Sequence, residues 1–347
     1  GIYFSYDLLK IMGSSNESIN LAKEYTDVIF LGSIVFLIQT SLNAILYSQG
    51  DTKSYRNFLI VGLIFNIILN PIFIFGLFFI PAFGIAGLAI STILIQFAGC
   101  VYLFLKVNKT ELKIVLKIEN FFPRRNFLVN IFHQVIPIAF SLFLVAIGSF
   151  ILLFFISIFG DQAIAGYGVG IRFEHLFTLP VIGLNTAVIS IASQNFGARR
   201  FNRIREVYFK AILIGVILMC FAGVIIYLFS ESIIHIFSND LEVIKFGSQY
   251  LKIVAFTIPI YPVFFISNAF FTAVKKTSFI FYSNLFRLII LPAIIVWSIL
   301  NIFDGGFQDI FFGLLYMNWI FGFFVLLLVR IVMINKFYEK KKFFFFI

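Results

Sequence analysis

The sequence predicts an all-α membrane protein that crosses the bilayer several times. Hydrophobic residues make up 61% of the 347 positions and charged residues only 12%, whereas a soluble domain carries about 25% charged residues. Apolar runs recur along the chain at about 20 residues, which is the length that a helix needs to cross a hydrocarbon layer of roughly 30 Å. The alternating ten-residue segments typical of a membrane barrel are absent. The spans are therefore expected to be helices.

Nine segments are long and apolar enough to be spans, and loops with charged residues separate most of them. In chain order they are 28–47, 57–79, 84–105, 128–158, 163–196, 211–229, 250–274, 279–303 and 310–334. The loops between them include Lys53 and Arg56, then Lys106 to Arg125, Asp161, Arg199 to Lys210, Glu231 to Lys245, Lys275 with Lys276, and Asp304. Cys100 and Cys220 lie within spans, which indicates reduced, buried thiols rather than a disulfide or a metal site.

The basic residues are distributed unevenly between the loops. A net charge of +10 could indicate nucleic-acid binding, but 20 of the 26 Lys and Arg residues lie in one set of alternate loops and in the C-terminal tail. Cytoplasmic loops are enriched in Lys and Arg, so nine spans in strict alternation place the C-terminus in the cytoplasm and residue 1 outside. We expect a multi-pass protein of the inner membrane, with the lipid bilayer and no nucleic acid as its partner.

Residues 8–53 resemble residues 233–278 at a constant offset of 225. The matched pairs include Ile11 with Ile236, Glu17 with Glu242, Tyr25 with Tyr250, Asn43 with Asn268 and Thr52 with Thr277. Both copies run in the same direction, so the repeat predicts two halves related by an axis along the membrane normal. Chance matching between two strings rich in Ile and Phe is the alternative explanation.

The repeat predicts the domain organisation. Shifting the first spans of the second half by 225 residues places their counterparts before residue 1, so the chain is expected to be an N-terminally truncated form of a protein with two six-helix bundles and 12 helices. About nine helices and a stub are expected here. The expected parts are 1–105 (stub of the third helix, helices four to six), a basic cytoplasmic linker 106–126, a C-terminal six-helix bundle 127–334 and a basic cytoplasmic tail 335–347.

Four stretches, in register along nearly the whole chain, resemble the multidrug and toxic compound extrusion (MATE) family. They are "LYSQGDTKSYRN" (46–57), "NIILNPIFIFGLFFIPAFGIAGLAIST" (66–92), "FGDQAIAGYGVGIRFEHLFTLPVIGLNTAVISIASQNFGARRFNR" (159–203) and "SNLFRLIILPAIIV" (283–296). They look like the loop after the fourth helix of the family, its fifth and sixth helices, its eighth helix with the Q-N-x-G-A turn, and its eleventh helix.

The resemblance implies a MATE-like two-bundle fold with a central cleft that opens alternately to either side. It also implies secondary active antiport, in which small organic, often cationic compounds are exported in exchange for H+ or Na+. We expect a monomer without a cofactor, and no metal beyond a possible Na+ as the coupling ion.

Arg172, Glu174 and His175 interrupt the apolar span 163–196. Because a charge facing lipid there costs about 2.5 kcal/mol or more, these side chains are expected to face a water-filled cleft or a partner. Arg172 and Glu174 are about 200° apart on a helix and cannot pair, whereas Arg172 and His175 share a face. Gly166 and Gly170 have the GxxxG spacing that lets helices approach closely.

Glu174 is the only carboxylate well inside a span and is the candidate for binding the coupling cation or the substrate. The alternative is a structural ion pair between the lobes, for example with Arg287. We expect Arg172 and His175 to be structural or to line the cleft.

Asn66 and Asn70 lie one turn apart before Pro71, on one helix face. In some branches of the MATE family the second position is an aspartate of a first-lobe cation site, and Thr92 looks like the threonine of the same site. Asn70 can ligate Na+ or bond to a drug, but it cannot carry a proton. Hydrogen bonding between helices is the equally weighted alternative for all three residues.

Asn268 is the main polar group near the inner end of the span 250–274 and is a further candidate. Neither this span nor 128–158 contains an acid, which argues against a second-lobe sodium site of the NorM type.

Other classes of function have less support. An intramembrane enzyme would need a nucleophile with a base, or paired acids, whereas His133, His175 and His235 lie far apart in the sequence. A channel filter is not recognisable. A lipid-linked saccharide flippase of the same superfamily fold is the main alternative, although only Arg172 and Arg287 would supply cationic lining. A non-functional fragment is the third possibility, since a first lobe without its first helices cannot close a cleft.

Overall fold

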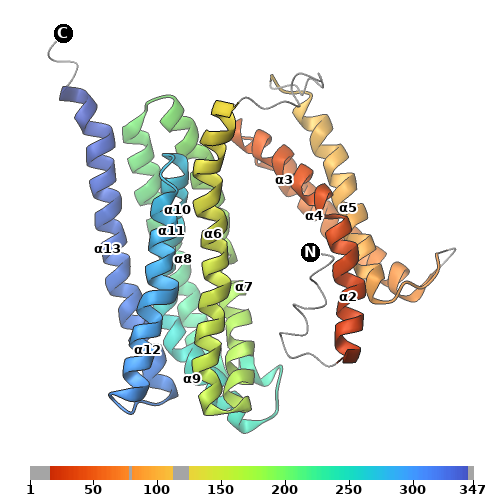
Figure 1. The fold of residues 1–347 in the computed structure, drawn as a ribbon, viewed down its shortest axis with the longest axis vertical. Coiled ribbons are helices and arrows are strands. Elements are labelled where there is room, and N and C mark those ends of the chain that lie inside the picture. Colours follow the sequence, from red (N-terminus) through yellow and green to blue (C-terminus); the bar gives the residue numbers. More distant parts are fainter. Residues whose placement is uncertain (1–15, 78–79, 112–124, 343–347) are drawn as a thin grey trace. The chain divides into compact units, whose positions relative to one another are not determined.

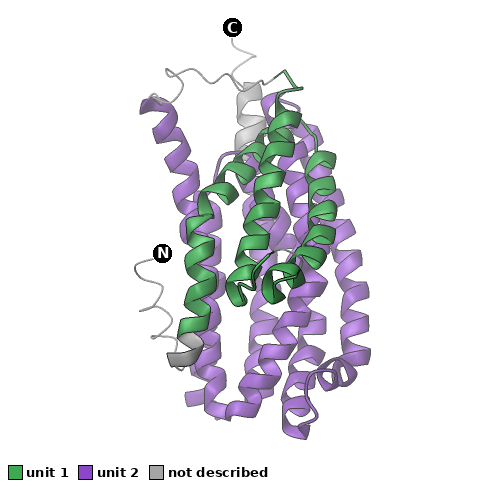
Figure 2. Ribbon diagram, turned by 90° about the vertical axis from the view of Figure 1, so that its right-hand side faces the viewer, with its two compact units in different colours: residues 1–122 green, residues 123–347 purple. Residues whose placement is uncertain are grey.

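The computed structural model describes residues 16–77, 80–111 and 125–342. All the regular elements in these ranges are helices (Figure 1), which confirms the all-α prediction. The chain divides into two compact units, Gly1–Phe122 and Pro123–Ile347 (Figure 2). The stub expected before residue 16, residues 112–124 of the basic linker and residues 343–347 of the tail lie outside the described residues.

The described residues of unit 1 form four helices, and α5 packs against each of the other three. They are α2 (Asn16–Leu31), α3 (Ser33–Ser48), α4 (Lys53–Phe75) and α5 (Ile85–Val107). The single span predicted at 28–47 is bent by 48° where α2 meets α3. The bend lies at Gly32, where a Cβ atom would lie 2.4 Å from Cδ1 of Ile93 on α5. A larger residue at this position would require the Ile93 side chain to move.

Unit 2 contains the remaining helices, three of which are broken by short turns of another helical type. They are α6 (Arg125–Ile156) with η2 (Ser157–Phe159), α7 (Asp161–Gly197), α8 (Phe201–His235), α9 (Leu241–Thr257) with η3 (Ile258–Ile260) and α10 (Tyr261–Ala273), α11 (Ser278–Leu285) with η4 (Phe286–Ile290) and α12 (Leu291–Asn301), and α13 (Phe307–Lys342). Several run one to two turns beyond the predicted apolar spans.

The continuous rod made by α9, η3 and α10 is the central helix of unit 2. In its most apolar window 72% of the residues are buried, against 11–39% in the other spans of the unit. It packs against α7, α8 and α13. The break at η3 coincides with Pro259, which has no N–H to donate to the carbonyl one turn back. The π turn η4 ends just before Pro292.

The described residues contain eight helices that are long and apolar enough to cross a membrane, or nine if the bent pair α2–α3 is one span. Many large apolar side chains are exposed on both units, including Leu63, Phe143, Phe221 and Ile320. In a soluble protein such exposure would be a liability, whereas in a bilayer these side chains meet hydrocarbon. Both cysteines are free, as expected, but the prediction that both are buried was wrong, since Cys220 is exposed on α8.

Candidate functional site

Unit 2 encloses a cavity of about 590 Å³ that is lined by side chains from α6, α7, α9, α10, α13 and the broken helix between Ser278 and Asn301. Much of the lining is apolar. Its polar members are Ser141, Ser149, Tyr167, Glu174, His175, Thr178, Asn185, Tyr250, Thr257, Tyr261, Asn268, Thr272, Asn284, Arg287 and Asn318. Among these, Glu174 and Arg287 carry the formal charges, one of each sign.

Glu174 is buried, with 8% of its surface exposed, and both of its carboxylate oxygens accept hydrogen bonds from tyrosines. The Tyr250 hydroxyl donates to Oε2, and the Tyr261 hydroxyl donates to Oε1 at 2.6 Å. Eleven residues separate the two tyrosines, which is close to three helical turns, so they lie on one face of the central helix. A buried carboxylate with two neutral donors is solvated by the protein instead of by water.

The tyrosine cluster is fixed by aromatic packing and by the small residues of α7. The ring of Tyr250 makes edge contacts with Tyr167 at 4.9 Å and with Phe311 at 4.8 Å between ring centroids. A Cβ atom on Gly170 would lie 2.5 Å from Cδ1 of Tyr250, and one on Gly166 would lie 2.7 Å from backbone atoms of α9. The close helix approach predicted from the GxxxG spacing is therefore confirmed.

Arg287 lies on the π turn η4 and is held without a carboxylate partner among the described residues. Its Nε donates to Oδ1 of Asn318 at 3.0 Å, and its guanidinium carbon lies 3.8 Å from the ring centroid of Phe264. The same guanidinium lies 5.4 Å from the ring centroid of Tyr261. Tyr261 thus contacts both charges of the cavity, Glu174 through its hydroxyl and Arg287 through its ring.

The remaining candidates from the second half are divided between the cavity and the surface. His175 and Asn268 line the cavity, as does Thr178, whose hydroxyl donates to the backbone carbonyl of Glu174 at 2.7 Å. Arg172 is exposed and does not belong to the lining. The structure therefore brings Glu174, His175, Asn268 and Arg287 to one cavity and leaves Arg172 outside it.

In unit 1, Asn66 and Asn70 form a hydrogen-bonded chain that continues to Ser91 on α5. The Asn70 Nδ2 donates to Asn66 Oδ1 at 2.6 Å, and the Ser91 hydroxyl donates to Asn70 Oδ1. The hydroxyl of Thr92 donates to the carbonyl of Leu88 on its own helix at 2.8 Å. The two asparagines are joined, as their spacing suggests, whereas Thr92 bonds within α5.

Four residues of these networks were not among the candidates: Tyr250, Tyr261, Asn318 and Ser91. A signal for the tyrosines exists in the sequence. Tyr250, Thr257, Tyr261 and Asn268 follow one another at seven, four and seven residues, which places them along one face of a mainly apolar helix. Asn318 and Ser91 carry no comparable pattern, since each depends on which helix packs opposite.

The cavity combines groups that can hold a charged or polarisable small molecule. Its volume lies within the range of about 300–1,000 Å³ that is usual for ligand pockets. The Glu174 carboxylate can take a proton or face a cation, and the rings of Tyr250, Tyr261, Phe264 and Phe311 can contact one. In the described part of the chain, no cluster of three or more His, Cys, Asp or Glu residues is arranged to hold a metal ion.

Comparison with known proteins places the chain among membrane transporters. The sequence model of the MatE family matches residues 1–72 and 137–297. The probable multidrug resistance protein YoeA of Bacillus subtilis is 27% identical over 221 residues, which are 63% of this chain and 48% of that protein. The probable multidrug resistance protein NorM of Thermotoga maritima is 30% identical over 235 residues, or 67% of this chain and 50% of that protein. This chain spans about half the length of these relatives.

Solved structures show the same fold. A MOP superfamily transporter from Pyrococcus furiosus superposes with a TM-score of 0.88 at 23% identity, over 96% of this chain and 74% of that one. The outward-facing form of a multidrug resistance MATE transporter gives a TM-score of 0.86 at 22% identity, over 94% of this chain and 72% of that one. The family match covers more than half of the chain, so the chain belongs to the MATE family, whose members are membrane transporters and not enzymes.

Proposed function

We propose that the protein exports small organic cations across the inner membrane in exchange for H+ or Na+, by alternating access, with its C-terminus in the cytoplasm. Multidrug resistance relatives and the family match support the drug substrates. The observation that carries the proposal is the buried Glu174 carboxylate in the unit 2 cavity, solvated by two tyrosine hydroxyls. One carboxylate cannot neutralise two cations, so a coupling cation and a cationic substrate compete for it.

Exchange of a substrate for a coupling ion requires that the two compete for one binding site. A substrate cation that reaches the cavity finds Glu174 with the rings of Tyr250 and Tyr261 beside it. When H+ or Na+ takes the carboxylate, the electrostatic attraction for the substrate is lost and the substrate leaves. The substrate and the coupling ion then occupy the cavity in turn, and each favours release of the other.

The unit 1 asparagines support a secondary role in this scheme. Asn66 and Asn70 are amides, which bond to Na+ or to a polar substrate group but do not carry a proton. Their present bonds to each other and to Ser91 would have to open for either ligand. If the coupling ion is H+, we expect Glu174 and not these asparagines to carry it.

The flippase alternative receives no further support from the lining of the cavity. A lipid-linked saccharide carries phosphate, which is best bound by several cations. Arg287 is the one permanent cation in the lining, and Asn318 and Phe264 already hold it.

The experiment expresses the protein from its complete coding sequence in cells that lack their own drug exporters and follows ethidium efflux. Glu174→Gln is expected to abolish efflux at equal protein levels, while Glu206→Gln, which changes an exposed glutamate on α8, is expected to leave it unchanged. Equal efflux from the parent and from Glu174→Gln would reject the role of Glu174. No efflux from the parent would reject drug export and favour the flippase, which a defect in envelope synthesis on gene deletion would then support.

A further inference from the structure

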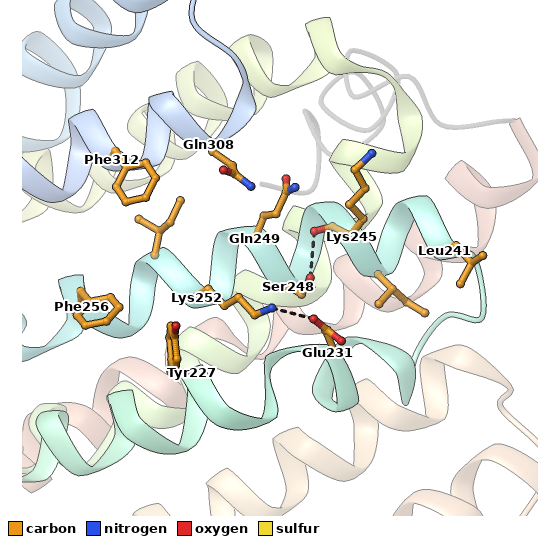
Figure 3. Close-up of a pocket in the computed structure, with 12 residues that line it drawn as sticks. Tyr227, Glu231, Leu241, Lys245, Ser248, Gln249, Lys252, Phe256, Gln308 and Phe312 are labelled. Carbon is orange, nitrogen blue, oxygen red and sulfur yellow. Dashed lines mark hydrogen bonds and ion pairs between the residues drawn. The ribbon is translucent and has the colours of Figure 1, made fainter.

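A second pocket, of about 620 Å³, lies between α8, α9 and the start of α13, and it shares no lining residue with the cavity around Glu174 (Figure 3). We call it the α8–α9 pocket. Its charged and amide side chains are Glu231, Lys245, Gln249, Lys252 and Gln308. Its aromatic side chains are Tyr227, Phe256 and Phe312.

The polar and aromatic groups are separated along the helix axes. Lys245 lies four residues into α9, about 6 Å from its start, whereas Phe256 lies about 22 Å from it. On α8, Glu231 is about 6 Å from the end of the helix and Tyr227 about 12 Å. Figure 3 shows Phe256 and Tyr227 gathered at one end of the pocket and Lys245 toward the other. The pocket therefore changes from polar near the helix ends to aromatic further along the spans.

Each lysine of this pocket lies beside one carboxylate. Lys252 Nζ lies 2.7 Å from Glu231 Oε1, and Lys245 lies 3.4 Å from the Glu242 carboxylate. An ammonium has three N–H donors, and Lys252 gives one of them to Glu231 in the described part of the chain. Lys252 lies two residues after the start of the apolar span 250–274, and 42% of its side chain is exposed. A lysine near the end of a span can extend its ammonium group to the polar headgroup level of a bilayer.

A membrane phospholipid has the same order of groups as the pocket. We infer that the α8–α9 pocket binds a phospholipid, with the phosphate diester at Lys245 and Lys252 and the acyl chains against Tyr227, Phe256 and Phe312. The phosphate accepts the lysine N–H donors that Glu231 leaves free, and Gln249 and Gln308 can donate to its oxygens. Free phosphate would leave the aromatic end of the pocket empty, and an uncharged lipid would offer no anionic acceptor to the N–H donors of Lys245 and Lys252 that their glutamates do not take.

The test uses the full-length protein, purified in detergent and stripped of lipid, with native mass spectrometry as the readout. The probes are dioleoyl phosphatidylglycerol, dioleoylglycerol (the same chains without phosphate) and inorganic phosphate. We expect the phospholipid to bind and the other two probes to bind at least about tenfold more weakly. Equal binding of dioleoylglycerol, or of inorganic phosphate, would overturn the inference.

Three variants locate the site. The double variant Lys245→Gln/Lys252→Gln is expected to weaken phospholipid binding by about tenfold or more, whereas the control Lys210→Gln/Lys276→Gln, which changes two lysines outside the pocket, keeps it within about twofold. Glu231→Gln removes the competitor for Lys252 and is expected to keep or tighten binding. If Glu231→Gln weakened binding as much as the double variant, the lysine–glutamate pair would be only structural and the inference would be wrong.

Discussion

Replacing Tyr261 with Phe removes one hydroxyl from the Glu174 site and little else. The donor to Oε1 at 2.6 Å is lost, while the ring that packs in the cavity and faces the Arg287 guanidinium stays. Tyr250 still donates to the other carboxylate oxygen. The variant therefore isolates the energy of one charge-assisted hydrogen bond from the effect of burial.

The size of the effect follows from the charge of the acceptor. A hydrogen bond to an ionised group contributes about 1.5–3 kcal/mol, and one between neutral groups about 0.5–1.5 kcal/mol. Tyr261→Phe should lower the free energy of unfolding by the larger amount in the parent and by the smaller amount in a Glu174→Gln background. The double-mutant cycle should give a coupling energy of about 1–2 kcal/mol.

The measurement is reversible unfolding of the purified protein in mixed micelles, followed by circular dichroism. Tyr282→Phe is the control, because that tyrosine is 56% exposed and its replacement should change the free energy of unfolding by less than about 0.5 kcal/mol. If the coupling energy between Tyr261 and Glu174 were zero, with both single variants folded, the view of Glu174 as a carboxylate solvated by tyrosines would be refuted.

Two further predictions concern packing and pH. Gly166→Ala should lower the free energy of unfolding of unit 2 by about 1–3 kcal/mol, because the new methyl group would meet the backbone of α9. Gly168→Ala on the same helix places its methyl group in open space and should be neutral or stabilising. Chemical denaturation of both variants measures the two effects. For Asp51, partial burial raises the pKa, but hydrogen bonds from the Ser54 hydroxyl and backbone, with the charge of Lys106, outweigh it and hold the pKa below the ordinary value of 3.8. Since the folded-state pKa is depressed, the contribution of Asp51 to the stability of unit 1 is fully present above the ordinary pKa of 3.8 and is lost as the pH falls through the folded-state pKa. The difference in the free energy of unfolding between the parent and Asp51→Asn should therefore be larger at pH 6 than at pH 3.

The helices were predictable because their signal is local. Composition and the length of the apolar runs identify the spans, and the GxxxG spacing of Gly166 and Gly170 indicates where α7 meets another helix. The bend at Gly32 was not predicted, since the apolar run 28–47 continues through it without a proline. The exposure of Cys220 was not predictable either, because the sequence of an apolar helix alone does not tell which face meets lipid.

The site was predictable only in part. Glu174 is identified by being a carboxylate inside an apolar span, but its partners come from another helix. An ion pair with Arg287 was the alternative role considered for Glu174, and the sequence could not reveal that two tyrosines contact its carboxylate. Asn66 and Asn70 are joined as the helical period suggests, whereas the bond to Ser91 depends on how α5 packs.

The central claim is that Glu174 is where the coupling cation and the substrate exchange. Its most direct test is transport of ethidium by the full-length protein in liposomes under an imposed H+ or Na+ gradient, for the parent and for Glu174→Gln at equal protein density. We predict gradient-driven transport by the parent with one of the two ions, and none by the variant. Gradient-driven transport by Glu174→Gln at the rate of the parent would contradict the claim.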